Sequence, residues 1–257
     1  MKPEKSTKKT RSLLQKESAL DIASHLHYRN AADKTYSDSN TVETNSDQQL
    51  PMERIDEDVN LEMMAETYMP HFLKYVGKAS ISKNTVQKAK PCVIWLTGLS
   101  AAGKTTLADD LTQKLNDRSV RTISLDGDAI RQAVKLTGFD EQSRRKHNLT
   151  VGHIAAKFES QGYVVIVSLI SPYLSVRETI RQMCCRFIEV YVSTGIDECI
   201  KRDPKGLYIK ALNGELKDFT GISAPYEVPA NPEITIDTTN KNISTCSDQV
   251  IHYYESL

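Results

Sequence analysis

The chain has 257 residues, and its 33 lysine and arginine residues balance 33 aspartate and glutamate residues. This length suits one main α/β core with an appendage, and the zero net charge argues against the broad basic surface that nucleic-acid binding needs. The five cysteines form no C-x-x-C pair, and no apolar run approaches the length of a membrane span. We therefore expect a cytoplasmic protein with no nucleic-acid partner and no membrane partner.

Residues 1–88 have the polar composition of an N-terminal extension that buries little apolar surface. Two stretches in it predict short helices. Residues 12–28 place apolar side chains at helical spacing, and residues 53–69 form a second helical stretch before Pro70. These helices either accompany the following domain or belong to an arm that binds a partner.

From residue 89 to the end, apolar runs alternate with amphipathic helical stretches. The runs are rich in valine and isoleucine without alternation, which is typical of strands buried on both faces. This region predicts one α/β domain, a P-loop-type three-layer sandwich with a mainly parallel five-stranded sheet, helices on both faces and ligands at the carboxyl ends of the strands. The strand candidates are residues 92–97, 121–126, 163–170, 187–194 and 234–238. The helical stretches are residues 106–115, 177–186 and 246–257.

The segment WLTGLSAAGKTT, residues 95–106, has the spacing G-x-x-x-x-G-K-[ST] between the first strand and the first helix. Backbone N–H groups of such a loop point at phosphate oxygens, and the helix N-terminus adds positive charge. Lys104 is predicted to contact the β and γ phosphates, and the Thr105 hydroxyl to bind Mg²⁺. The predicted nucleotide-binding residues are Gly98, Leu99, Ser100, Ala101, Ala102, Gly103, Lys104, Thr105 and Thr106.

The loop alone fits a GTPase, a motor ATPase or a small-molecule kinase. The guanine-reading segment N-K-x-D of a GTPase is missing, and the second strand ends in Leu-Asp-Gly-Asp rather than in the single acidic residue usual in motor ATPases. Asp126 and Asp128 project to the same side if the strand continues, and Gly127 permits a tight bend. One carboxylate could then hold Mg²⁺ through water while the other accepts a hydroxyl proton.

Several further motifs resemble the adenylyl-sulfate kinase family, whose members phosphorylate the 3′-hydroxyl of adenosine 5′-phosphosulfate (APS) to give PAPS. The resemblance covers about two thirds of the chain, from Val93 to the C-terminus, and includes none of the first 88 residues. The motifs in chain order read GLSAAGKTTLA, LDGDAIR, TGFDEQSR, LISPY and RDPKGLYIKALNGELKDFTGISAPYEVPANPE. The last is the most specific, because no general structural reason would make it recur.

The resemblance implies roles for four side chains on the acceptor side. Arg131 matches an arginine that reaches the anionic phosphosulfate, for which a forked guanidinium is suited, and Arg144 matches the second substrate-binding arginine. Phe139 and Phe219 match the aromatic residues that sandwich the adenine of APS, which also keeps water away from the transfer.

The resemblance also covers the end of the third strand and the segment 203–221. Ile170 and Ser171 match positions that line the substrate, and Ser171 stands where some family members are described as carrying a phosphoserine. Lys205 matches a lysine near the transferred phosphate, and residues 203–221 resemble the mobile lid of the family. Among the candidate catalytic residues, Asp128 is the base or the metal–water ligand, Asp126 supports it, and Lys104 and Ser171 complete the set.

Two positions depart from the family pattern. The substrate-binding asparagine that usually follows Arg144 by three residues is His147 here, and an asparagine, Asn148, stands one residue later where the family has isoleucine. One residue on a helix is a rotation of about 100°, so Asn148 cannot simply replace the missing side chain. The arginine that usually follows I-S-P-Y is Leu174 here. His147 could hydrogen-bond a substrate oxygen or carry charge near neutral pH.

Together these features predict an ATP-dependent and Mg²⁺-dependent kinase that phosphorylates APS and supplies PAPS, either for sulfate assimilation or for sulfotransferases. One alternative keeps the chemistry and changes the acceptor to another nucleotide conjugate, such as cytidine diphosphoramidate. Another alternative is a non-catalytic nucleotide-binding module with a partner-binding N-terminal arm. The resemblance also implies a homodimer.

Overall fold

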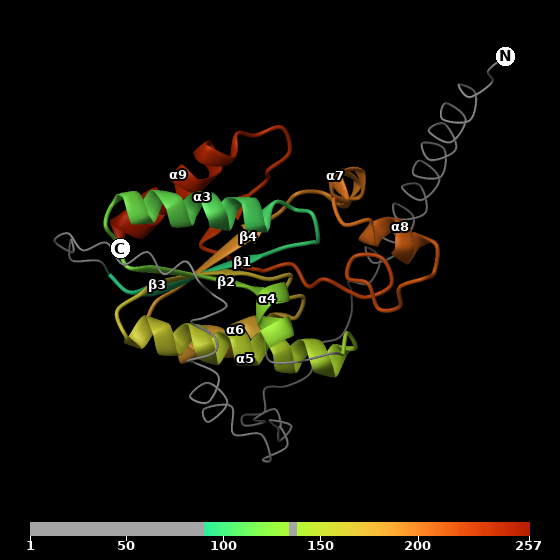
Figure 1. The fold of residues 1–257 in the computed structure, drawn as a ribbon, viewed down its shortest axis with the longest axis horizontal. Coiled ribbons are helices and arrows are strands. Elements are labelled where there is room, and N and C mark those ends of the chain that lie inside the picture. Colours follow the sequence, from blue (N-terminus) through green and yellow to red (C-terminus); the bar gives the residue numbers. More distant parts are fainter. Residues whose placement is uncertain (1–89, 134–137) are drawn as a thin grey trace, which may run out of the picture. The chain divides into compact units, whose positions relative to one another are not determined.

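Five parallel strands form the sheet at the centre of the computed structural model, which describes residues 90–133 and 138–257 (Figure 1). Their order in the sheet is β2-β3-β1-β4-β5, and every neighbouring pair is parallel. This confirms the predicted sheet, whereas the predicted extension 1–88 and its two helices lie outside the described residues. The strands are β1 (Cys92–Thr97), β2 (Thr122–Asp126), β3 (Val164–Ser168), β4 (Phe187–Val192) and β5 (Ile234–Ile236).

Strand β1 is buried at all six positions, as its unbroken apolar sequence predicted. Successive side chains of a strand point to opposite faces. Ile94 and Leu96 accordingly belong to the core on one face, and Val93 and Trp95 belong to the core on the other. A strand with this composition is stable only between two layers of helices.

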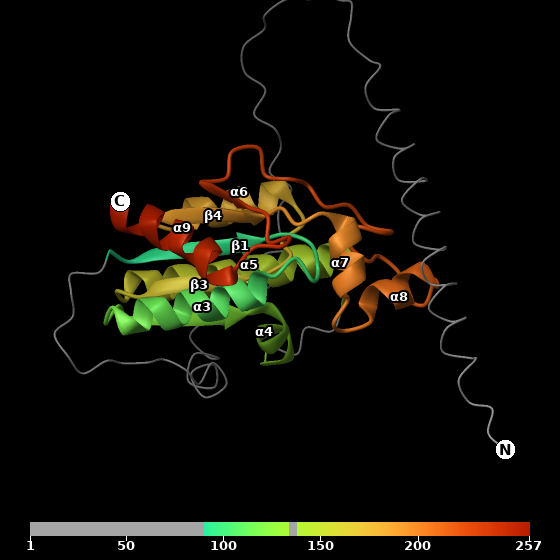
Figure 2. The same cartoon turned by 90° about the horizontal axis from the view of Figure 1, so that it is seen from above.

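Helices cover both faces of the sheet, with α3 and α9 on one side and α5 and α6 on the other (Figures 1 and 2). Asp140 caps the start of α5, where its carboxylate accepts a hydrogen bond from the Ser143 N–H. No helix in the described ranges is long and apolar enough to cross a membrane. The helices are α3 (Lys104–Asp117), α4 (Gly127–Ala133), α5 (Glu141–Ser160), α6 (Leu174–Met183), α7 (Ile196–Arg202), α8 (Leu207–Leu212) and α9 (Ile243–Ser256).

Helices α5 and α6 approach each other closely at Gly152. A Cβ atom at this position would lie 2.6 Å from Cγ1 of Ile180, which is fully buried. The absence of a side chain at Gly152 therefore sets how near the two helices can lie.

Some elements end elsewhere than the sequence predicted. Strands β3 and β4 end at Ser168 and Val192, before the predicted residues 170 and 194, because the chain turns into loops at the carboxyl edge of the sheet. Helix α6 begins at Leu174 and stops at Met183 instead of spanning 177–186. Beyond it, the backbone N–H groups of Cys185 and Arg186 donate to the carboxylate of Glu159 at 2.9 and 2.6 Å. This contact competes with helical hydrogen bonds and explains the early end.

Candidate active site

A cavity of about 830 Å³ opens at the carboxyl ends of the strands. It is lined by the loop between β1 and α3, the end of β2, the start of α5, the end of β3 and the segment after α7. All the predicted site residues line it except Gly98, Leu99 and Ala102, which lie in the loop behind its surface. The fold therefore brings the predicted donor and acceptor residues to one cavity.

The phosphate loop has a backbone conformation that few residues other than glycine can adopt. Gly98 has a φ of 148°, and a Cβ atom there would lie 2.4 Å from the carbonyl oxygen of Val192 on the neighbouring strand. Lys104 follows the loop, and its Nζ donates to the carbonyl oxygens of Gly98 at 2.9 Å and Leu99 at 2.6 Å. Burial lowers the pKa of Lys104 to about 8, so at pH 7 the amine is mainly protonated.

Three side chains from later parts of the chain hold the phosphate loop from behind. The carbonyl oxygen of Ala102 accepts from the hydroxyls of Thr194 at 3.1 Å and Thr238 at 2.9 Å. Arg202 donates in turn to the Thr238 hydroxyl at 2.8 Å. Arg202 also lines the cavity, and it was not among the predicted site residues although it is the first residue of the recognised motif RDPKGLY.

Asp126 is the last residue of β2 and Asp128 does not continue the strand, contrary to one option that the sequence left open. The strand ends at Asp126 and helix α4 begins at Gly127, because the Asp126 carboxylate accepts the backbone N–H of Asp128 at 3.0 Å. Asp128 is largely exposed and forms an ion pair with Lys205, whose Nζ lies 2.6 Å from Oδ2. Asp128 thus lies on the first turn of a helix and reaches the segment after α7.

The donor side offers oxygen ligands suited to Mg²⁺. Thr105, Asp126 and Asp128 all line the cavity, and the Thr105 side chain is exposed. Within the described residues no group of three or more histidine, cysteine or acidic side chains forms a closed metal cage. Magnesium usually takes only one or two protein oxygens together with phosphates and water, so this donor set fits it.

Arg131 and Phe139 lie together at the mouth of the cavity. The Arg131 guanidinium carbon lies 4.6 Å from the centre of the Phe139 ring, and its Nη1 donates to the carbonyl oxygen of Gly138 at 2.5 Å. Phe139 is 61% exposed, so its ring is available for stacking and does not fill the core.

Arg144 and Phe219 join the start of α5 to the segment after α8. Arg144 donates to the Thr220 hydroxyl at 2.7 Å and to the carbonyl oxygen of Asp218. Phe219 packs edge-on against Tyr208, with ring centres 5.0 Å apart, and the Tyr208 hydroxyl donates to the carbonyl oxygen of Ser100 in the phosphate loop at 3.1 Å. The predicted lid is therefore tied to both sides of the cavity.

His147 and Asn148 line the cavity with polar atoms that have no partner. Both residues are at least 95% buried, and neither Nδ1 of His147 nor Nδ2 of Asn148 makes a hydrogen bond. Burial, and next the charge of Arg131, lower the pKa of His147 to about 4. The imidazole is neutral at pH 7, so the charged form that the sequence left open is disfavoured.

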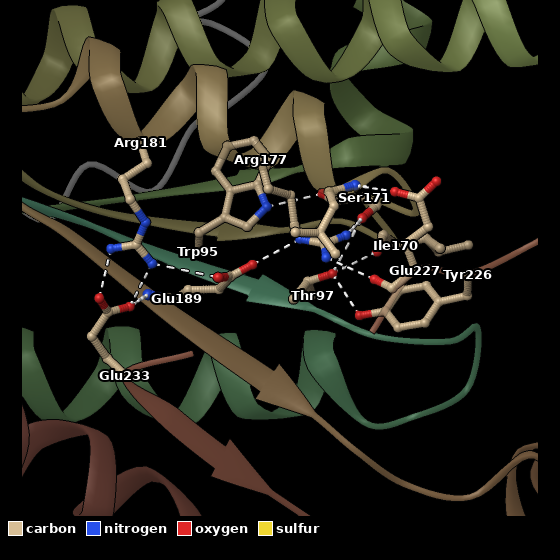
Figure 3. A network of polar contacts seen from close by, with 11 residues as sticks. Trp95, Thr97, Ile170, Ser171, Arg177, Arg181, Glu189, Tyr226, Glu227 and Glu233 are labelled. Atoms are coloured by element: carbon tan, nitrogen blue, oxygen red, sulfur yellow. Dashed lines mark hydrogen bonds and ion pairs between the residues drawn. The ribbon is translucent and has the colours of Figure 1, made fainter. Parts of the chain in front are cut away.

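The turn after β3 places Ile170 and Ser171 against the cavity (Figure 3). Ser171 is buried in a left-handed conformation with a φ of 47°, and its hydroxyl accepts the indole N–H of Trp95 at 2.9 Å. The carbonyl oxygen of Ile170 accepts from the Thr97 hydroxyl at 2.8 Å and from the backbone N–H of Gly98 at 3.4 Å. This turn thus contacts the phosphate loop directly.

Comparison with known proteins identifies one family. The adenylylsulphate kinase model matches residues 90–237. The chain is 40% identical over 196 residues to a probable adenylyl-sulfate kinase of Halalkalibacterium halodurans, which spans 74% of this chain and 96% of that protein. It is 44% identical over 167 residues to the adenylyl-sulfate kinase of Staphylococcus epidermidis, which spans 64% of this chain and 84% of that protein.

One solved structure extends this comparison. The Mycobacterium tuberculosis APS kinase CysC, in complex with AMPPNP and APS, superimposes with a TM-score of 0.62 at 33% identity. The match covers 65% of this chain and 99% of that one.

Proposed function

This chain belongs to the adenylylsulphate kinase family, and from that premise we propose that it transfers the γ-phosphoryl group of ATP to the 3′-hydroxyl of APS, giving PAPS and ADP. The observation that carries the proposal, besides family membership, is one cavity lined both by six residues of the phosphate loop, from Ser100 to Thr106 without Ala102, and by the acceptor-side arginines Arg131 and Arg144. A kinase needs both substrates in one enclosure from which water can be excluded.

On the donor side, the backbone of the phosphate loop and Lys104 would neutralise charge that develops on the transferred group. Lys104 is buried and mainly protonated at pH 7, which suits this role. Thr105, with Asp128 acting through water, would hold Mg²⁺, which would supply positive charge to the phosphates. Little covalent chemistry is then required of the protein.

On the acceptor side, Asp128 is our candidate to accept the proton of the 3′-hydroxyl or to bind the metal through water, with Asp126 in support. Its ion pair with Lys205 must open or be shared for either role. Both side chains of this pair are more than half exposed, so the rearrangement costs little. Released from Asp128, Lys205 would contact the transferred phosphoryl group.

The remaining acceptor residues would bind the two ends of APS. Arg131 and Arg144 would bind the phosphosulfate through their forked guanidinium groups. Phe139 and Phe219 would stack on the adenine, and both line the cavity. Neutral His147 would accept a hydrogen bond from the acceptor through its unpartnered Nδ1, while Ile170 and Ser171 line the pocket.

A coupled assay for ADP release tests the proposal with APS and, separately, with cytidine diphosphoramidate. We expect saturable turnover with APS and none in EDTA. In Asp128→Ala, turnover should be lost while calorimetry still detects ATP binding, which would exclude a non-catalytic nucleotide-binding module. A lack of APS turnover would refute the main proposal. Preferential turnover of the cytidine conjugate would support the alternative acceptor and would mean that His147 and Leu174 are more than neutral variation within the family.

Two further expectations belong to this proposal. The homodimer implied by the family resemblance is tested by the mass of the chain in solution. All five cysteines are free thiols, which agrees with the expected cytoplasmic location.

A further inference from the structure

Arg177 lies at the centre of a buried polar network (Figure 3) that includes Ser171, a residue of the cavity lining. It projects from α6, is only 2% exposed, and its guanidinium donates in three directions. Nε donates to Oε1 of Glu189 at 2.7 Å, Nη1 to the carbonyl oxygen of Ser171 at 2.5 Å and Nη2 to the carbonyl oxygen of Glu227 at 2.7 Å. One side chain thus joins α6, β4, the turn after β3 and the segment that returns from the predicted lid.

The contact with Ser171 holds a turn that the backbone alone does not favour. A serine with a φ of 47° is strained, and such conformations persist where their surroundings enforce them. The Trp95 indole holds the Ser171 hydroxyl, and Arg177 holds its carbonyl oxygen. The preceding residue, Ile170, contacts the first glycine of the phosphate loop through its own carbonyl. Arg177 therefore acts at the junction between the acceptor turn and the donor loop.

The contact with Glu227 fastens the returning segment to the same turn. The backbone N–H of Glu227 donates to the carbonyl oxygen of Pro172 at 2.8 Å, and its carboxylate accepts the N–H of Leu174 at 2.5 Å. The neighbouring Tyr226 hydroxyl lies 2.8 Å from the hydroxyl of Thr97, just before the phosphate loop. The end of the returning segment, the acceptor turn and the last residue of β1 are thereby fixed together.

We propose that Arg177 is a positioning residue for phosphoryl transfer, which sets the spacing between the acceptor turn and the phosphate loop. The inference rests on the proposed kinase function. In-line transfer depends on the distance between the attacking oxygen and the phosphorus atom, and small misplacements lower the rate steeply. A planar guanidinium can hold a carboxylate and two carbonyl oxygens in fixed directions, whereas a lysine ammonium cannot reach all three.

Arg181 provides a matched control. It lies one turn later on α6 and contacts the same Glu189 carboxylate at 3.4 Å, together with Glu233 at 2.6 Å. Its hydrogen bonds go to Phe187, Glu189 and Glu233, and none of them reaches the Ser171 turn or Glu227. Arg177→Lys and Arg181→Lys are therefore the same substitution in one ion-pair cluster, and only the first disturbs the turn. Lysine keeps a positive charge beside Glu189, which favours folding of both variants.

Steady-state kinetics give the first readout. In Arg177→Lys we expect kcat with APS to fall about 30-fold because donor and acceptor lose their alignment. The KM for ATP should stay within about two-fold, because the phosphate loop keeps its own supports. Arg181→Lys should retain the kcat of the unsubstituted chain. A milder variant, Tyr226→Phe, keeps the ring stacked on Tyr191 and removes one hydroxyl, so kcat should fall about three-fold.

The indole N–H of Trp95 gives a second readout that needs no acceptor. Trp95 is the only tryptophan in the chain, so its indole gives a single resonance in a nitrogen–proton NMR spectrum. Because this N–H donates to the Ser171 hydroxyl, we expect its protection from hydrogen exchange to fall at least about ten-fold in Arg177→Lys and to persist in Arg181→Lys.

The outcomes separate the two proposals. Equal indole protection in the two lysine variants, or an unchanged kcat in Arg177→Lys, would overturn the positioning role. If Arg177→Lys fails to fold, an unchanged kcat in Tyr226→Phe would overturn it instead. A lack of APS turnover by the unsubstituted chain would refute the proposed function, and the indole readout would still decide whether Arg177 holds the turn.

Discussion

The phosphate loop of the donor half is one continuous segment, residues 98–106, whereas the acceptor half draws side chains from α4, α5, the turn after β3 and the segment after α7. The donor half offers mainly backbone groups, and Thr194 and Thr238 fix its carbonyl from behind. The acceptor half offers side chains, and two of its buried polar atoms, on His147 and Asn148, have no partner. Donor binding is thus a property of local backbone shape, while acceptor choice depends on side chains brought together by the fold.

Removing the positive charge of Lys104 from the donor half should have the largest effect on kcat. Lys104→Met should lower kcat about 10³-fold, because charge on the transferred group loses its buried counter-charge. The coupled ADP assay measures this, with Lys114→Met as control. Lys114 lies on the same helix but binds Ser244 and Asp248 on α9, so its loss should affect stability and spare turnover. If Lys104→Met kept more than a tenth of the original kcat, the donor half would not depend on the charge of Lys104.

Lowering the pH should destabilise the folded chain, because His147 in the acceptor half is buried in its neutral form. Burial lowers the pKa of His147 from 6.5 to about 4. Between these values the unfolded chain binds a proton at this histidine and the folded chain does not, so stability falls as the pH decreases. The shift corresponds to about 3 kcal/mol by pH 4. Urea unfolding at several pH values measures it, and His147→Phe should lose less stability on acidification than the unsubstituted chain. Equal losses would show that His147 is not the responsible group.

At neutral pH, His147→Phe tests whether the acceptor half can be changed without affecting ATP binding in the donor half. His147→Phe removes the unpartnered Nδ1, so the KM for APS should rise about 10-fold through loss of one hydrogen bond, while the KM for ATP stays unchanged. His252→Phe, on the exposed side of α9, is the matched control and should change neither constant. An equal rise in both KM values would mean that the two halves are not separable at this residue.

The smallest effect is expected at Asn148. Asn148→Ile removes a buried amide group without a partner and should stabilise the fold by about 1 kcal/mol, measured as the free energy of unfolding in urea. The KM for APS should rise if the amide serves the acceptor. Asn116 also has an unpartnered amide atom but does not line the cavity, so Asn116→Leu should leave the KM for APS unchanged. A destabilised Asn148→Ile would show that the amide has a partner in solution.

The sequence was sufficient to predict the donor half and the sheet, because both depend on local patterns. Unbroken apolar runs such as 92–97 admit only a buried strand, and the spacing from Gly98 to Thr105 admits few backbone shapes. The predicted five-stranded parallel sheet is confirmed. Boundaries were less predictable, since the end of β2 depends on Asp126 capping the next helix and the end of α6 depends on Glu159.

The contacts that complete the acceptor half could not be predicted from local pattern. In the sequence, Arg177 looks like a charged residue on the exposed face of a helix. Its proposed positioning role depends on a hydrogen bond to Glu227, which lies 50 residues later in the chain. In the donor half, the support that Arg202 gives the phosphate loop likewise depends on Thr238, 36 residues away. The roles of the acceptor residues carried over from the family, such as Phe139 and Lys205, stay predictions that the kinetic experiments address.

The close approach at Gly152 has a consequence for the acceptor pocket. Helix α5 carries Arg144 and His147 near its start, α6 carries Arg177, and the two helices touch where Gly152 meets Ile180. A side chain at position 152 would clash with Ile180, so either the Ile180 side chain or one of the two helices would have to shift. A substitution at this position, which does not line the cavity, could therefore move Arg144 and His147, which do.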